Sequence, residues 1–308
     1  MTDQRQVGRP SGMRTRIIIL TGPTPSSTLC IPEEYGRFDL LIHCGNLTQH
    51  STGSEFGQVM RYIRRFNVGP KILIAGDKDV SLDPQAYRFH SRRQVHVAEE
   101  STAVYEDPKA DEVDAGAPAP SADAAPIESR TQALGKERRL QTRKYERPEA
   151  TRTRMQKMWR WNVRFLNEGT QEILLPNRAP LRLYVSSYTP DAGKSLAFQY
   201  QTHHHDFSIE PDTDIVVTHG PPWAVLDRSP PESSALYCKG STSLWHAIKR
   251  APPRLHCFGP ERTWRGAAVA TWQGSDSPLW AEVDATQEPD SQELSGTVIP
   301  WDRVRRYF

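Results

Sequence analysis

No stretch of the 308-residue sequence approaches the roughly 18 uninterrupted apolar residues that a membrane-spanning helix requires. The N-terminal segment from Met1 to Arg16 is polar, carries four arginines and lacks the apolar core of a secretory signal. The sequence therefore predicts a soluble, cytoplasmic protein without a membrane partner.

Cysteine is scarce, and the four cysteines form no C-x-x-C pair, so neither a disulfide framework nor a thiolate zinc site is expected. The net charge is only +2, so no overall field selects nucleic acid as a partner. A P-loop, a G-x-G-x-x-G sequence after a strand, and the H-E-x-x-H and G-x-S-x-G motifs are also missing. These absences argue against a nucleotide-binding protein and a serine hydrolase.

The composition changes sharply in the middle of the chain. Glu106 to Glu128 holds seven acidic residues, one lysine and no aromatic residue, and Arg130 to Arg164 holds twelve basic against three acidic residues. Such segments bury too little apolar surface to offset the entropy lost on ordering. We expect a disordered N-terminus (1–15), a disordered insertion (106–149) available to a protein partner, and one domain formed by 16–105 and 150–308.

Outside the insertion, apolar runs closed by glycine or polar residues alternate with segments of helical spacing, which is typical of an α/β fold with helices on the outside. A helix is also expected from Arg152 through Leu166. The other expected helices are Ser54–Asn67 and Ser243–Arg250, and the expected strands are Arg16–Leu20, Asp39–His43, Lys71–Ala75, Leu181–Val185, Ile215–Val217, Arg254–Phe258 and Ala267–Trp272.

Glycine and polar side chains follow five of these strands. In open α/β sheets, ligands bind beyond the carboxyl ends of the strands, so these segments are the candidate site. They are Thr21-Gly22-Pro23, Cys44-Gly45-Asn46, Gly76-Asp77-Lys78-Asp79, Thr218-His219-Gly220-Pro221-Pro222 and Phe258-Gly259-Pro260-Glu261-Arg262.

Four motifs carry a family resemblance: DLLIHCGNLTQHS from Asp39, IAGDKDVSLD from Ile74, VVTHGPPWAVLD from Val216 and LHCFGPERTWRGA from Leu255. In this order they resemble the calcineurin-like metallophosphoesterases, in the branch with DLLIHAGDLTQHG, IAGNHD, THGPP and FGHxH. The resemblance spans about Arg16 to Trp272. It implies a four-layer α/β/β/α sandwich of two mixed sheets.

The resemblance also implies a phosphoesterase with two divalent metals held by Asp, His and Asn side chains, but this sequence departs from that ligand set. Proline has no side-chain donor and arginine stays protonated, so neither binds a cation. We therefore predict no metal and no cofactor. The family positions are occupied here by Thr21, Pro23, Asn46, Asp77, Lys78, Pro260 and Arg262, and only the motif histidine, His219, is kept together with Asp79.

Several functions follow from this pattern. The first is a pseudoenzyme that acts as a metal-free binding or regulatory protein for a small organic anion or a phosphate ester. The second is a repurposed metal-independent cyclase, isomerase or lyase, for example in a natural-product pathway of secondary metabolism, and the third is a residual phosphoesterase. The candidate catalytic residues are His219, Asp79 and Asp77, and the candidate substrate-binding residues are Lys78, Arg262, Asn46, Trp223 and Glu261.

Three other histidine features have structural interpretations. His203-His204-His205-Asp206 resembles a metal-binding tract, but it precedes the His219 strand without an organised partner, so a surface loop is favoured. His43 and His256 are expected to be buried strand histidines bonded to backbone.

Overall fold

The computed structural model describes residues 15–23, 37–92, 145–191, 196–201, 205–226 and 240–259, together with the backbone of 267–273 and 277–283. Most of the predicted N-terminal and insertion segments lie outside the described residues. Glu261 and Arg262, two of the predicted substrate-binding residues, also lie outside them.

A first sheet is built from four parallel strands in the order β1-β2-β3-β4. Its central strands are fully buried runs of apolar residues, as parallel sheets covered on both faces require. The strands are β1 (Ile17–Leu20), β2 (Leu40–His43), β3 (Lys71–Leu73) and β4 (Val163–Phe165).

A second four-stranded sheet has the order β10-β9-β6-β5, in which β10, β9 and β6 are parallel and β5 is antiparallel to β6. Its strands are β5 (Gly169–Leu174), β6 (Pro180–Ser186), β9 (Ile215–Thr218) and β10 (Leu255–Phe258). Two further strand pairs are smaller: β7 (Thr189–Pro190) with β8 (Gln199–Tyr200), and β11 (Ala267–Gln273) with β12 (Ser277–Val283). Two short 3-10 helices, η2 (Val80–Leu82) and η3 (Lys157–Trp161), lie elsewhere in the chain.

In the described part of the chain, the sheets are covered by the helices α1 (Gly53–Arg64), α4 (Pro148–Gln156) and α5 (Thr242–Arg250), and residues 84–92 are helical as well. Thr52 and Glu55 close a capping box at the start of α1, and the Ser241 side chain accepts the Leu244 N–H at the start of α5. None of the helices within the described ranges combines the length and the apolar character needed to cross a membrane.

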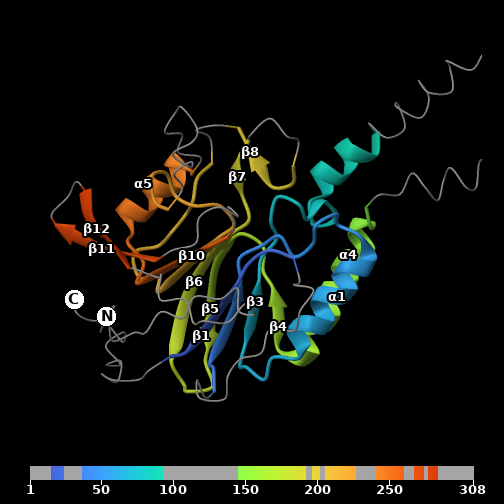
Figure 1. Cartoon of the computed structure of the whole chain (residues 1–308), viewed down its shortest axis with the longest axis horizontal. Helices are drawn as coiled ribbons and strands as arrows, with labels where there is room; N and C mark the ends of the chain where they lie inside the picture. Colours follow the sequence, from blue (N-terminus) through green and yellow to red (C-terminus); the bar gives the residue numbers. More distant parts are fainter. Residues whose placement is uncertain are drawn as a thin grey trace, which may run out of the picture.

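Figure 1 shows α1 and α4 on one side of the strands and α5 on the other. Buried side chains form three clusters that connect these elements. The first cluster joins the first sheet to α1 and α4, with Leu41 and Phe56 at its centre. The second joins the two sheets, through residues such as Ile42 and Val217. The third joins the second sheet to α5, where Tyr184 meets Leu244. The fold is therefore α/β, and buried side chains of the two sheets share one cluster.

The expected strands and helices outside the 152–166 segment are present, but the structure corrects three predictions. Val163 and Phe165 belong to strand β4 and not to the expected helix, because Asn162 takes a left-handed conformation (φ 56°) that ends η3. The first sheet is parallel within the described chain, whereas a mixed sheet was expected. Residues 145–149, assigned to the insertion, are folded: the Glu146 N–H donates to Ser51 and α4 already begins at Pro148.

Deleting residues 107–144 is expected to leave the melting temperature within about 2 °C of the wild-type value. The His90 and Tyr145 ring centroids, on either side of the deleted region, lie 5.5 Å apart, so the shortened chain is not stretched. Differential scanning calorimetry measures the effect. A fall of more than about 5 °C would mean that the deleted residues pack on the domain.

Candidate functional site

Segments from both sheets meet where β2, β3 and β9 end. The key link is His219, which directly follows β9 and is 4% exposed. Its Nδ1 lies 2.9 Å from the Cys44 carbonyl oxygen, just past β2, and its Nε2 lies 3.4 Å from Asp77 Oδ1, just past β3. The carboxyl ends of the strands therefore converge, as the sequence pattern predicted.

Three glycines allow this convergence, because each lies where a side chain would collide with a neighbouring segment. A Cβ on Gly45 would lie 2.5 Å from His219 Nδ1, and one on Gly76 would lie 2.3 Å from the Asn46 nitrogen. A Cβ on Gly259 would lie 2.3 Å from the Cys44 carbonyl oxygen. Backbone and imidazole can approach this closely only where the residue is glycine.

The bonds of His219 define which ring nitrogen carries a proton. A carbonyl oxygen only accepts hydrogen bonds, so Nδ1 donates to Cys44. Nε2 is therefore the nitrogen that can exchange a proton, and it faces Asp77. This arrangement holds the imidazole in one orientation, as acid–base chemistry requires.

Asp77 is the acidic group at the mouth of the site, with a side chain 27% exposed. Its partial burial favours the neutral acid, but hydrogen bonds from His219 and Asn46 and the charge of Lys78 outweigh it and lower the pKa of Asp77. Asp77 is thus held as a carboxylate between a histidine and a lysine.

Asn46 and Lys78 are tied to each other and to the same loops. Asn46 is 5% exposed and has a left-handed backbone (φ 54°). Its Oδ1 accepts the Lys78 backbone N–H at 3.0 Å, and the Lys78 ammonium donates to Gln49 Oε1 at 2.9 Å. Gln49 was not among the predicted site residues, because a lone glutamine after the β2 motif carries no chemical signal of its own.

Asp79 follows β3 two residues after Asp77, but it is fully buried, and both of its carboxylate oxygens accept hydrogen bonds. Oδ2 accepts the backbone N–H groups of Leu47 and Gly76, each at 2.9 Å. Oδ1 accepts the backbone N–H of Thr48 at 2.9 Å and its hydroxyl at 2.6 Å. Complete burial nevertheless raises the pKa of Asp79. The predicted catalytic Asp79 therefore holds two loops together and has no face open to a substrate.

The described residues do not fit the two-metal centre implied by the family resemblance. Asn46 Oδ1 and both oxygens of Asp79 are already used by N–H and O–H donors. Within the ranges given above, no group of three or more His, Cys, Asp or Glu side chains converges to hold a metal ion. A bridging metal pair needs several free oxygen or nitrogen ligands, which this set does not offer.

Trp223 lies further along the loop after β9, with 44% of its surface exposed. Its backbone N–H donates to the Ser241 carbonyl oxygen at 3.0 Å. In the part of the chain that the structure describes, its ring makes no aromatic contact and does not join His219, Asp77 and Lys78. Its assignment to the substrate site remains a prediction.

Two strand histidines flank the site, of which His43 is buried and His256 is partly buried. Burial lowers the pKa of His43 to about 4 and that of His256 to about 3. His256 Nε2 lies 2.8 Å from the Thr218 hydroxyl, which donates its own proton to the Gly220 carbonyl oxygen, so Nε2 is the donor. His256 therefore bonds to a side chain, where a backbone partner was expected.

A second polar cluster, which sequence reasoning missed, includes His205. Its ring lies between those of Tyr188 and Tyr200, with centroids at 4.6 and 4.9 Å, and its Nε2 lies 2.7 Å from Glu168 Oε1. The side chain is 15% exposed, so the surface loop expected for the histidine tract is wrong at this residue. Glu168 and the tyrosines are distant from His205 in sequence, and only the HHHD run hinted at a site.

No family model matches the chain. A curated relative is the probable rhamnogalacturonate lyase C of Emericella nidulans, which is 26% identical to this chain over 238 residues. The match covers 76% of this chain and 16% of the relative, so the chain spans about a sixth of that protein's length. This chain and the relative are thus similar in sequence over that region.

Proposed function

We propose that this chain is a divergent protein of the calcineurin-like metallophosphoesterase fold that binds a small organic anion or a phosphate ester without a metal ion. Two sheets packed between α1 and α4 on one side and α5 on the other support the family's four-layer α/β/β/α arrangement. The order of the four sequence motifs supports it as well. In this proposal the protein is a binding or regulatory pseudoenzyme.

One observation carries the proposal: the groups left open at the strand ends suit an anion better than a cation. The Lys78 ammonium has three N–H donors, and one of them donates to Gln49 Oε1. His219 Nε2 is the ring nitrogen not bonded to backbone, and it faces Asp77. The Lys78 ammonium balances the Asp77 carboxylate, and Arg262 would make the local charge positive on the sequence evidence.

Titration with inorganic phosphate and with galacturonate in the presence of EDTA tests this proposal. Lys78→Gln is expected to weaken binding about tenfold, because a charge-assisted hydrogen bond contributes about 1.5–3 kcal/mol. Arg262→Gln is expected to weaken it as well. Isothermal titration calorimetry measures both effects.

The matched control is Arg61→Gln, which removes one positive charge from the exposed side of α1 and is expected to change nothing. Binding that appears only after Mn²⁺ is added would favour the residual phosphoesterase. Equal binding by wild type and the Lys78 variant would place the anion elsewhere on the protein.

A metal-independent enzyme is the second candidate, favoured by the fixed His219 imidazole facing the Asp77 carboxylate. A histidine oriented by a backbone carbonyl oxygen, with its other nitrogen facing a carboxylate, is suited to proton transfer. The relative's printed name is that of a lyase. In a β-elimination on a uronate, His219 Nε2 would accept the proton from the carbon next to the carboxylate, and Lys78 would neutralise the carboxylate's charge. The bond from the β-carbon to its oxygen would break, and that oxygen would leave with a proton from water.

Hydrogen exchange in D₂O separates this candidate from a binding protein. With galacturonate as the probe, proton abstraction replaces the hydrogen beside the carboxylate by deuterium, which proton NMR detects. His219→Gln is expected to abolish this exchange and to leave binding within about threefold of wild type. Binding without exchange would favour the regulatory function.

A further inference from the structure

The described residues 189–191 and 196–200, which contain β7 and β8, form an arm that contacts two segments of the strand-end site. Figure 1 shows both strands beyond the ends of the second sheet. The Thr189 N–H donates to the Phe198 carbonyl oxygen at 2.9 Å and joins the two parts of the arm. At Gly220, directly after His219, an added Cβ would lie 3.0 Å from the Thr189 methyl group. The arm therefore packs against the His219 segment.

The arm also holds the peptide group that joins Asp77 to Lys78. The Ala197 N–H donates to the Asp77 carbonyl oxygen at 2.8 Å, and Ala197 is fully buried. On the other side of the same peptide group, the Lys78 N–H donates to Asn46 Oδ1 at 3.0 Å. A peptide group is planar, so bonds to both its oxygen and its hydrogen fix its orientation. The arm thus helps to set the directions of the Asp77 carboxylate and the Lys78 side chain.

The conformation of the arm is not one that its sequence favours. Phe198, the residue after Ala197, has a left-handed backbone (φ 53°), which is unfavourable for a bulky side chain. Its N–H donates to Asp83 Oδ2 at 2.8 Å, and its ring meets that of Tyr188 edge to face, with centroids 5.9 Å apart. A strained residue persists only where the surrounding structure holds it in place. The arm therefore depends on contacts outside itself.

His205 makes such contacts with both parts of the arm. Its ring lies between those of Tyr188, directly before β7, and Tyr200, in β8, with centroids at 4.6 and 4.9 Å. Its Nε2 lies 2.7 Å from Glu168 Oε1. A carboxylate only accepts hydrogen bonds, so Nε2 is the donor. The ring is thus stacked on the arm and bonded at its edge to Glu168.

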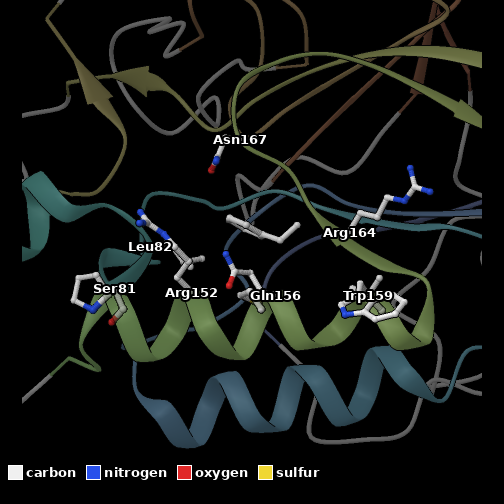
Figure 2. A pocket seen from close by; sticks show the side chains of 11 residues that line it. Ser81, Leu82, Arg152, Gln156, Trp159, Arg164 and Asn167 are labelled. Atoms are coloured by element: carbon white, nitrogen blue, oxygen red, sulfur yellow. The ribbon is translucent and has the colours of Figure 1, made fainter.

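Glu168 anchors this stack to the sheets. It lies on the short link between β4 and β5, and Figure 2 shows the preceding residue, Asn167, across a groove from α4. The Tyr184 hydroxyl, on β6, donates to Glu168 Oε1 at 3.1 Å. Burial favours the neutral acid, but hydrogen bonds from His205, Ser186 and Tyr184 outweigh it and lower the pKa of Glu168. The carboxylate is therefore a fixed acceptor for the His205 N–H.

We propose that His205 and Glu168 are positioning residues for the strand-end site. Glu168 holds the His205 ring, the ring holds the two tyrosines of the arm, and the arm holds the Asp77–Lys78 peptide group. Loss of the pair releases this peptide group without changing any residue of the site itself. The effect on a ligand rests on the proposed binding function, whereas the effect on the arm does not.

Amide hydrogen exchange, measured by NMR on the full chain, tests the arm without a ligand. His205→Ala is expected to speed exchange of the Ala197 and Phe198 amides at least about tenfold, because the arm then opens locally. Glu168→Gln keeps the size of the side chain, and a smaller increase of about threefold is expected. His246→Ala, which replaces an exposed histidine of α5, is the matched control and leaves both amides unchanged.

The His219 ring gives a second readout, which a loss of overall stability would not change. His219 Nε2 lies 3.4 Å from Asp77 Oδ1, so its nitrogen-15 chemical shift reports whether the carboxylate is still in place. His205→Ala is expected to move this shift toward the value measured in Asp77→Asn. His246→Ala is expected to leave it unchanged.

Unchanged exchange at Ala197, or an unchanged His219 chemical shift in His205→Ala, would overturn the proposal. Faster exchange that extends equally to the core amide of Val217 would also overturn it, because His205 would then stabilise the whole domain and not the arm.

Titration with inorganic phosphate separates this proposal from the binding function. If the wild type binds phosphate, His205→Ala is expected to weaken binding about threefold, and equal binding would overturn the positioning role. If the wild type binds no phosphate, the binding function fails for this ligand, and the exchange rates and the His219 chemical shift still decide the positioning role.

Discussion

Replacing Asp79 with alanine is expected to destabilise the protein by about 3–5 kcal/mol, the range for removing one partner from a buried charged network. The substitution leaves three backbone N–H groups and the Thr48 hydroxyl without their acceptor in a fully buried position. Each unsatisfied buried donor costs about 1–3 kcal/mol before relaxation. Urea denaturation followed by circular dichroism measures the free energy of unfolding.

Two further variants test the cause. Asp79→Asn keeps the shape of the side chain, but its NH₂ group must face backbone N–H donors, so we expect a loss of about 2 kcal/mol. Asp39→Ala removes a carboxylate that accepts the exposed Arg16 N–H, which can bond to water instead, and it is expected to cost less than about 1 kcal/mol. A loss for Asp79→Ala no larger than for Asp39→Ala would refute the role of Asp79 in holding the two loops.

Acidification from pH 7 to pH 4 is expected to lower the stability of the wild type through His43 and His256, by about 3 kcal/mol for each histidine. Burial depresses their folded pKa values to about 4 and about 3, from an ordinary value of 6.5. The unfolded chain therefore takes up protons as the pH falls below 6.5, while the folded chain does not. Their contribution is fully present above pH 6.5, and the His43 part is lost by pH 4.

Urea denaturation at a series of pH values gives the free energy of unfolding at each pH, and the effect is the slope of that free energy against pH. His43→Leu and His256→Leu are each expected to flatten the pH dependence between 6.5 and 4, whatever they do to the stability at pH 7. The matched control is His50→Gln, because the His50 side chain is 61% exposed. An unchanged slope in both leucine variants would mean that other groups cause the acid sensitivity.

Much of the candidate site was predictable because its positions follow strands. Buried apolar runs before Cys44, Gly76 and His219 identified the strands, and the carboxyl ends of parallel strands lie at one edge of a sheet. The roles of the residues were less predictable. Asp77 and Asp79 look equivalent in sequence, but one lies at the mouth of the site and the other is enclosed by backbone N–H groups. That difference depends on the path of the Asn46–Thr48 loop, which no local pattern encodes.

Strands with weak local signals were also missed. β4 has only three residues, and Val163 and Phe165 share the helical spacing of the preceding segment, so periodicity alone favoured a helix. Asn162 in the left-handed conformation and pairing with β3 decide the strand.

The sequence by itself determined the α/β class and the positions of most strands and helices, because these depend on residue type and short-range spacing. Tertiary structure decided which side chains are free to act. His219 is oriented by the carbonyl oxygen of Cys44, 175 residues away, and His205 is enclosed by two tyrosines and Glu168. Such contacts join segments far apart in the chain, and they form only when the two sheets pack and bring the strand ends together.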